Sequence, residues 1–162
     1  MNNLSVKQKI DDCIAEIRKI EAIINVFGQN HEIVPFLTHY MVIKCCGTIE
    51  SSFKAIISDY HSSTPIQARN YIEQTFTNSS LNPSKDNICK TLKKFDDNWN
   101  DDFKQRLSAE PNCNQLDASL RSLNNARNSF AHGGHPNASY INIKNYFLDS
   151  VRFIEILDDI IK

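Results

Sequence analysis

The chain has 162 residues, of which 41% are hydrophobic and 23% are charged, and its formal net charge is −1. This composition excludes a disordered chain, and the near-neutral charge excludes a global positive field of the kind that attracts nucleic acid. The length suffices for one domain with its own buried core, so we expect residues 1–162 to form a single domain.

The first half of the chain is predicted to be helical because its apolar residues recur three or four positions apart. One apolar stripe begins near Ile10 and ends at Gly28. The densest stripe predicts a long central helix from about Val34 to His61. A further helix is expected to start at the sequence TPIQ, residues 64–67. Three of its apolar residues are expected to face the core: Ile66, Ile72 and Phe76.

The second half continues the helical pattern. A loop over residues 78–84 leads to a helix that the acidic segment 96–102 interrupts. The next helix has apolar residues at helical spacing from Leu116 onward and is expected to end near His132, where two glycines follow. A last helix starts at about Ile143. Together these elements predict an all-α fold, an antiparallel bundle of five or six helices.

The cysteines and the chain start indicate the compartment. Five cysteines, an odd number without CxxC or zinc-finger spacing, predict reduced thiols. The start MNNLSVKQKIDDC has no apolar core of a signal peptide, and no apolar run has the length needed to cross a bilayer. We therefore expect a cytoplasmic protein that has no membrane partner.

The sequence ARNSFAHGG, residues 126–134, contains the polar residues of greatest interest. Arg127 continues the apolar stripe of Leu120 and Leu123, where a guanidinium group is costly without a partner. It therefore pairs with a buried carboxylate or lies where a ligand or another protein reaches it. Asn128 and His132 are four residues apart and share the neighbouring helix face. We expect these three residues to form a polar cluster at the helix end.

The chemistry of this cluster suits a phosphodiester. A histidine can take a proton from a hydroxyl group or give one to a leaving oxygen near neutral pH. An arginine fork can donate two hydrogen bonds to phosphate oxygens, whose negative charge grows in the transition state. Asn128 could add a further hydrogen bond. A capping histidine and a salt-bridged arginine would explain the same residues without catalysis.

The remaining histidines give little reason to expect a metal. The sequence HGGH would place His132 and His135 near one another, but no Cys, Asp or Glu is close in sequence to complete a site. Surface or capping roles suffice for His31, His39 and His61. We expect neither a metal nor another cofactor.

The segment RNSFAHGG, with the leucine stripe before it and INIKNYFLDSVRFIEILDDII after it, resembles the C-terminal half of a HEPN domain. Within that superfamily it is most similar to the RiboL-PSP-HEPN and MAE_28990-like branch. Arg127, Asn128 and His132 match the family pattern of an Arg, a polar residue, and a His after four to six intervening residues. The resemblance spans roughly residues 33–162 and is weak between 66 and 115.

The segment YMVIKCCGTIESSFKAIISDY is similar to an earlier core helix of the family, which often carries an acidic or polar residue facing the site. Glu50 is the matching residue, although a simple salt bridge would explain it equally well. The resemblance implies a metal-independent endoribonuclease in which two protomers form one cleft. The 2′-hydroxyl attacks the adjacent phosphate, and Arg127, His132, Asn128 and Glu50 are the implied catalytic residues.

The resemblance also implies partners: an RNA substrate, a second copy in a homodimer, and an antitoxin or regulatory protein. Such domains are commonly toxins of toxin–antitoxin pairs or antiviral defence effectors. The alternative is a HEPN-like module without catalysis that dimerises or regulates another protein. The near-neutral charge agrees with that alternative, whereas the intact Arg127, Asn128 and His132 set favours the nuclease.

Overall fold

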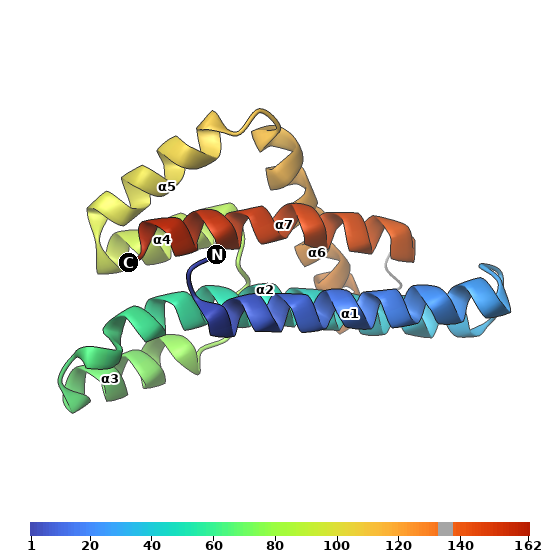
Figure 1. Ribbon diagram of the computed structural model, residues 1–162, viewed down its shortest axis with the longest axis horizontal. Helices are drawn as coiled ribbons and strands as arrows, with labels where there is room; N and C mark the ends of the chain where they lie inside the picture. Colours follow the sequence, from blue (N-terminus) through green and yellow to red (C-terminus); the bar gives the residue numbers. More distant parts are fainter. Residues whose placement is uncertain (133–137) are drawn as a thin grey trace.

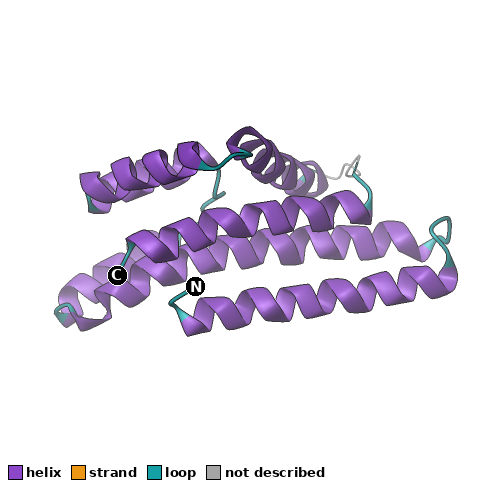
Figure 2. Cartoon of the chain, turned by 45° about the horizontal axis from the view of Figure 1, so that its top comes forward, coloured by secondary structure: helices purple, strands orange, loops and turns teal. Residues whose placement is uncertain are grey.

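The protein is a bundle of α-helices in the computed structural model, which describes residues 1–132 and 138–162 (Figure 1). Figure 2 shows only helices and their connections in these residues, which confirms the all-α class. Two single turns, a 3₁₀ turn at His61–Ser63 and a π turn at Glu73–Thr77, flank the third helix. The α-helices are α1 (Leu4–Phe27), α2 (Ile33–Tyr60), α3 (Ile66–Ile72), α4 (Lys85–Phe95), α5 (Asp97–Ala109), α6 (Cys113–Ala131) and α7 (Tyr140–Ile160).

The described residues contain more helices than the predicted five or six, because short helices fill the middle of the chain. The predicted interruption over 96–102 is wrong in extent, since Asp96 alone separates α4 from α5. Its backbone N–H donates to Leu92 at 2.8 Å and its side chain accepts from the N–H of Asn98 at 2.7 Å. One residue therefore ends one helix and caps the next.

Local signals explain most other helix ends. Asn3, Ser84 and Ser139 each accept a hydrogen bond from a backbone N–H three residues later, which caps α1, α4 and α7. Gly28 ends α1 with a φ of 88°, a left-handed conformation that favours glycine. The prediction that Ile66 faces the core is wrong, since its side chain is 52% exposed, whereas Phe76 is buried. Helix α3 is too short and too peripheral to bury a full apolar face.

The long helices α1, α2 and α7 lie side by side (Figure 1). Helix α1 runs antiparallel to α2, as the Glu16–Lys44 ion pair and the Asn3–Asp59 hydrogen bond show. It is also antiparallel to α7, where Asp158 accepts hydrogen bonds from the N–H groups of Asn2 and Asn3. Helices α2 and α7 consequently run in the same direction, and α6 crosses behind them (Figure 1).

The core fills the space between these helices. Four phenylalanines are completely buried, and apolar side chains from six of the seven α-helices surround them. The fully buried aromatic residues are Phe53, Phe103, Phe147 and Phe153. Among the described residues, no helix combines the length and apolar character required to cross a membrane. The packing therefore leaves α6 fixed on both α2 and α7, and this fixes the position of the predicted polar cluster.

Candidate functional site

The last two turns of α6 lie against the first half of α2. The buried Cys46 thiol donates a hydrogen bond to the Leu123 carbonyl at 3.4 Å, and the rings of His39 and Phe130 lie 4.8 Å apart. The residue numbers rise along α2 as they fall along α6, so the two helices are antiparallel. Arg127 falls between these two contacts on α6.

Arg127 is half-buried at this helix contact. Its guanidinium group forms no ion pair and no hydrogen bond with any residue in 1–132 or 138–162. It lies close enough to the Cys46 thiol to influence its ionisation. Burial raises the pKa of Cys46 to about 12, and the Arg127 charge opposes this rise. The sequence left open that Arg127 pairs with a buried carboxylate. The described part of the chain contains no such pair.

Asn128 and His132 are exposed in the same stretch of α6. His132 is the C-cap residue, and its backbone N–H donates to the carbonyls of Asn128 at 3.2 Å and Ser129 at 3.3 Å. At about 100° per residue, five residues along an α-helix turn a side chain by about 140°. Arg127 thus faces α2 while His132 lies well round the helix. One chain brings the three residues to the same helix end but not to one helix face.

Glu50 lies one turn beyond Cys46 on α2, and its carboxylate adds to the rise of the Cys46 pKa. Its Oε1 atom accepts hydrogen bonds from Lys54 Nζ at 2.7 Å and from the backbone N–H of Leu81 at 3.2 Å. Lys54 is buried and also donates to the Ser79 carbonyl. Glu50 therefore ties the segment after α3 to α2.

The comparisons with known proteins give one match. The family model RiboL-PSP-HEPN matches residues 8–162, nearly the whole chain. The chain belongs to the RiboL-PSP-HEPN family. The match confirms the resemblance and extends it to most of α1 and to the weakly similar middle of the chain. No curated protein and no solved structure matches this HEPN domain.

Sequence reasoning missed one residue at this end of the HEPN domain. His39 is half-buried, and its ring lies against the ring of Phe130. Phe130 lies between Arg127 and His132 in the sequence. His39 precedes Cys46 by seven residues, a spacing that places both side chains on one face of α2. The helical periodicity could therefore have indicated that His39 faces α6 together with Cys46. The predicted cap of Gly133 and Gly134 and the residue His135 lie outside the described residues.

An apolar stripe on α2 of the HEPN domain is exposed beside α6. Phe36, Tyr40 and Ile43 recur at helical spacing, and Gly47 continues their face. The side chain of Phe36 is 72% exposed and that of Ile43 is 45% exposed. We call these four residues the α2 stripe. It lies beside the α6 contacts of α2, and on its other side the Tyr40 hydroxyl donates to Glu16 on α1 at 2.9 Å.

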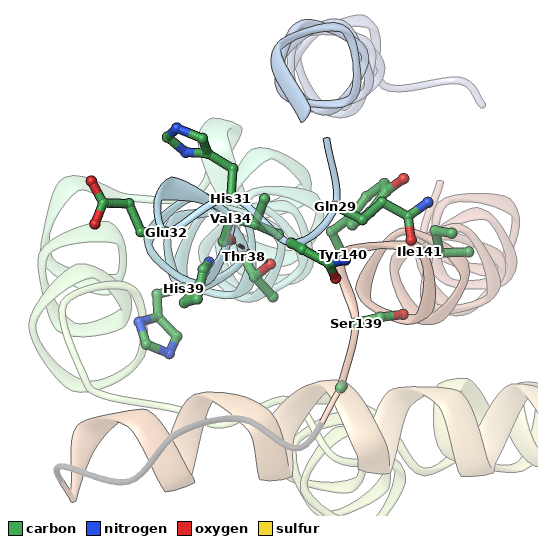
Figure 3. A pocket seen from close by; sticks show the side chains of 12 residues that line it. Gln29, His31, Glu32, Val34, Thr38, His39, Ser139, Tyr140 and Ile141 are labelled. Carbon is green, nitrogen blue, oxygen red and sulfur yellow. Dashed lines mark hydrogen bonds between the residues drawn. The ribbon is translucent and has the colours of Figure 1, made fainter. Parts of the chain in front are cut away.

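A pocket of about 690 Å³ opens at the same end of the HEPN domain. The α1–α2 connection, the first turns of α2 and the start of α7 enclose it (Figure 3). His39 lines the pocket and also contacts α6, so the pocket adjoins the end of the helix that carries Arg127. The HEPN domain thus has a half-buried cation, an exposed histidine, an apolar stripe and a pocket at one end.

Proposed function

We propose that the protein is a metal-independent endoribonuclease in which Arg127 binds the phosphate and His132 transfers protons. The half-buried guanidinium of Arg127, which has no partner in the described residues, is the main support for this proposal. Such a group is costly unless an anion reaches it, and phosphate matches its planar set of donors. Membership in the HEPN family supports a nuclease-like or nucleotide-related function.

The proposed reaction needs only proton transfer and charge stabilisation. A histidine takes the proton of the 2′-hydroxyl, the 2′-oxygen forms a bond to phosphorus, and the bond from phosphorus to the 5′-oxygen breaks. The leaving oxygen receives a proton, which gives a 2′,3′-cyclic phosphate and a 5′-hydroxyl end. Arg127 donates hydrogen bonds to the phosphate oxygens as their charge grows, and Asn128 assists.

A homodimer would complete this site. The roughly 140° between Arg127 and His132 on one helix means that a single chain presents them in different directions. A second copy packed on the α2 stripe would cover its exposed apolar side chains and bring a second Arg127 and His132 to the same cleft. One histidine could then act as base and the other as acid.

A charged residue introduced into the α2 stripe should dissociate the dimer. We expect Ile43→Asp to convert the dimer to a monomer at micromolar concentration and to reduce RNA cleavage at least tenfold, because burying an unpaired carboxylate at an interface is costly. Ile66→Asp is the matched control, since Ile66 is 52% exposed on the distant helix α3. Light scattering measures the oligomeric state of both variants, and an RNA cleavage assay measures their activity. A wild-type monomer that cleaves RNA would contradict the shared site.

Glu50 is proposed as a weaker, fourth residue of the site. Its bonds to Lys54 and to the Leu81 N–H support a positioning role, because they fix α2 to the following segment near Cys46 and Arg127. Its ion pair with Lys54 is also the salt bridge that the sequence left open. Direct contact with RNA is the less favoured of the two roles.

The decisive test of the function uses the purified protein, mixed RNA and EDTA. We expect cleavage to persist in EDTA and to leave cyclic phosphate and 5′-hydroxyl ends, which mass spectrometry distinguishes. A requirement for magnesium would indicate another class of nuclease. Absence of cleavage with any RNA would favour the alternative, a non-catalytic HEPN module that dimerises or regulates another protein.

The proposed biological role is that of a toxin in a toxin–antitoxin pair or of an antiviral defence effector. A ribonuclease of this kind harms its own cell unless it is held inactive, so an antitoxin or regulatory protein is the expected partner. Membership in the HEPN family and the proposed site support this role.

A further inference from the structure

The pocket beside the site has a lining that does not suit an anion, because Glu32 is among its residues. No lysine or arginine is among its lining residues, which come from the described part of the chain. The cation at the start of α7, Lys144, is paired with Glu21 at 2.8 Å. A phosphate therefore has no counter-charge in this pocket, whereas Arg127 provides one outside it.

The pocket combines apolar surface with polar groups, of which the Tyr140 hydroxyl and the Gln29 carboxamide have no partner among the described residues. Tyr140 is only 7% exposed, and its hydroxyl makes no hydrogen bond within 1–132 and 138–162. Figure 3 shows Gln29 and Tyr140 on the side of the pocket nearest α7, and Val34 and Thr38 on the α2 side. Carboxamide and hydroxyl groups can donate and accept, which is what the edge of a nucleobase requires.

A histidine of the pocket lining is oriented by two contacts. His31 Nδ1 accepts a hydrogen bond from the Ile33 N–H at 3.2 Å, and the His31 ring lies 4.8 Å from that of Phe27. Both contacts hold the imidazole in one orientation before any ligand arrives. Aromatic side chains of this kind stack on unpaired RNA bases.

The position of the pocket relates it to the reacting phosphate. His39 lines the pocket and contacts Phe130, which lies within about one helical turn of both Arg127 and His132. We propose that the pocket binds a nucleobase of the RNA substrate next to the phosphate that Arg127 holds. This rests on the proposed function, because the substrate is taken to be RNA. The pocket would make cleavage depend on the base at that position.

The test uses the ¹⁵N-labelled wild-type protein with adenosine, which has no phosphate and whose base pairs well with a carboxamide. We expect adenosine to shift the side-chain NH₂ signals of Gln29 and Asn30 and the backbone signal of Thr38. Inorganic phosphate should leave these signals in place. The double variant Gln29→Ala/Asn30→Ala should bind adenosine roughly tenfold more weakly, because it loses hydrogen bonds to the base edge.

The matched control is Gln67→Ala/Asn70→Ala on α3, which removes the same exposed groups at the other end of the molecule (Figure 1). It should bind adenosine like the wild type. Shifts caused by phosphate alone, or an equal loss in both double variants, would overturn the proposal. Cleavage of RNA without adenosine shifts in the pocket would overturn it and leave the nuclease standing. Adenosine shifts without cleavage would support the pocket and contradict the nuclease.

Discussion

The variant His132→Ala should lose RNA cleavage by a hundredfold or more while its helical fold persists. The reason is that His132 is the proposed proton-transfer group, and positioned acid–base groups contribute roughly 10²–10⁴-fold to a rate. The imidazole is exposed and makes no hydrogen bond with a described residue, so its removal leaves no cavity and no buried group unpaired. Single-turnover cleavage in EDTA, together with circular dichroism, measures both expectations.

The control for this variant is His135→Ala, which removes the other histidine of the HGGH sequence. Its cleavage rate should stay within a few-fold of the wild-type rate. If the two variants lose activity equally, the choice of His132 as the proton-transfer residue is wrong. Any toxicity to a host cell should follow the cleavage rate, so it should disappear in His132→Ala and persist in His135→Ala.

The variant Arg127→Ala should lose cleavage by at least a hundredfold without a fall in melting temperature. Removing one donor to the developing charge typically costs about 10²–10³ in rate. The guanidinium forms no ion pair within the described residues, so its loss breaks no salt bridge among them. Arg127→Lys should recover only part of the activity, because an ammonium group lacks the planar pair of donors.

Arg121→Ala provides the comparison, since Arg121 lies on the same helix and is exposed and paired with Asp117 at 2.9 Å. Its cleavage rate should equal that of the wild type, because surface ion pairs of this kind contribute little to stability or to the site. A melting temperature that falls in Arg127→Ala together with the activity would indicate that Arg127 stabilises the fold instead of binding RNA.

Apolar periodicity sufficed to predict the long helices, because each must bury one continuous face. The pattern of the central helix predicted Val34–His61, and α2 spans Ile33–Tyr60. The short elements were harder, since few residues carry their pattern. Ile66 was expected in the core and is exposed, because α3 packs at the periphery where only part of an apolar face meets other helices.

The sequence by itself determined the helical class, the helix end that carries Arg127 and His132, and the family resemblance, because these depend on local spacing. Only the tertiary structure decided that Arg127 has no carboxylate partner in the described residues, that His39 lies against Phe130 and that the Cys46 thiol donates to the Leu123 carbonyl. These contacts join helices that are distant in the chain. They depend on how α2 and α6 cross, which no local pattern encodes.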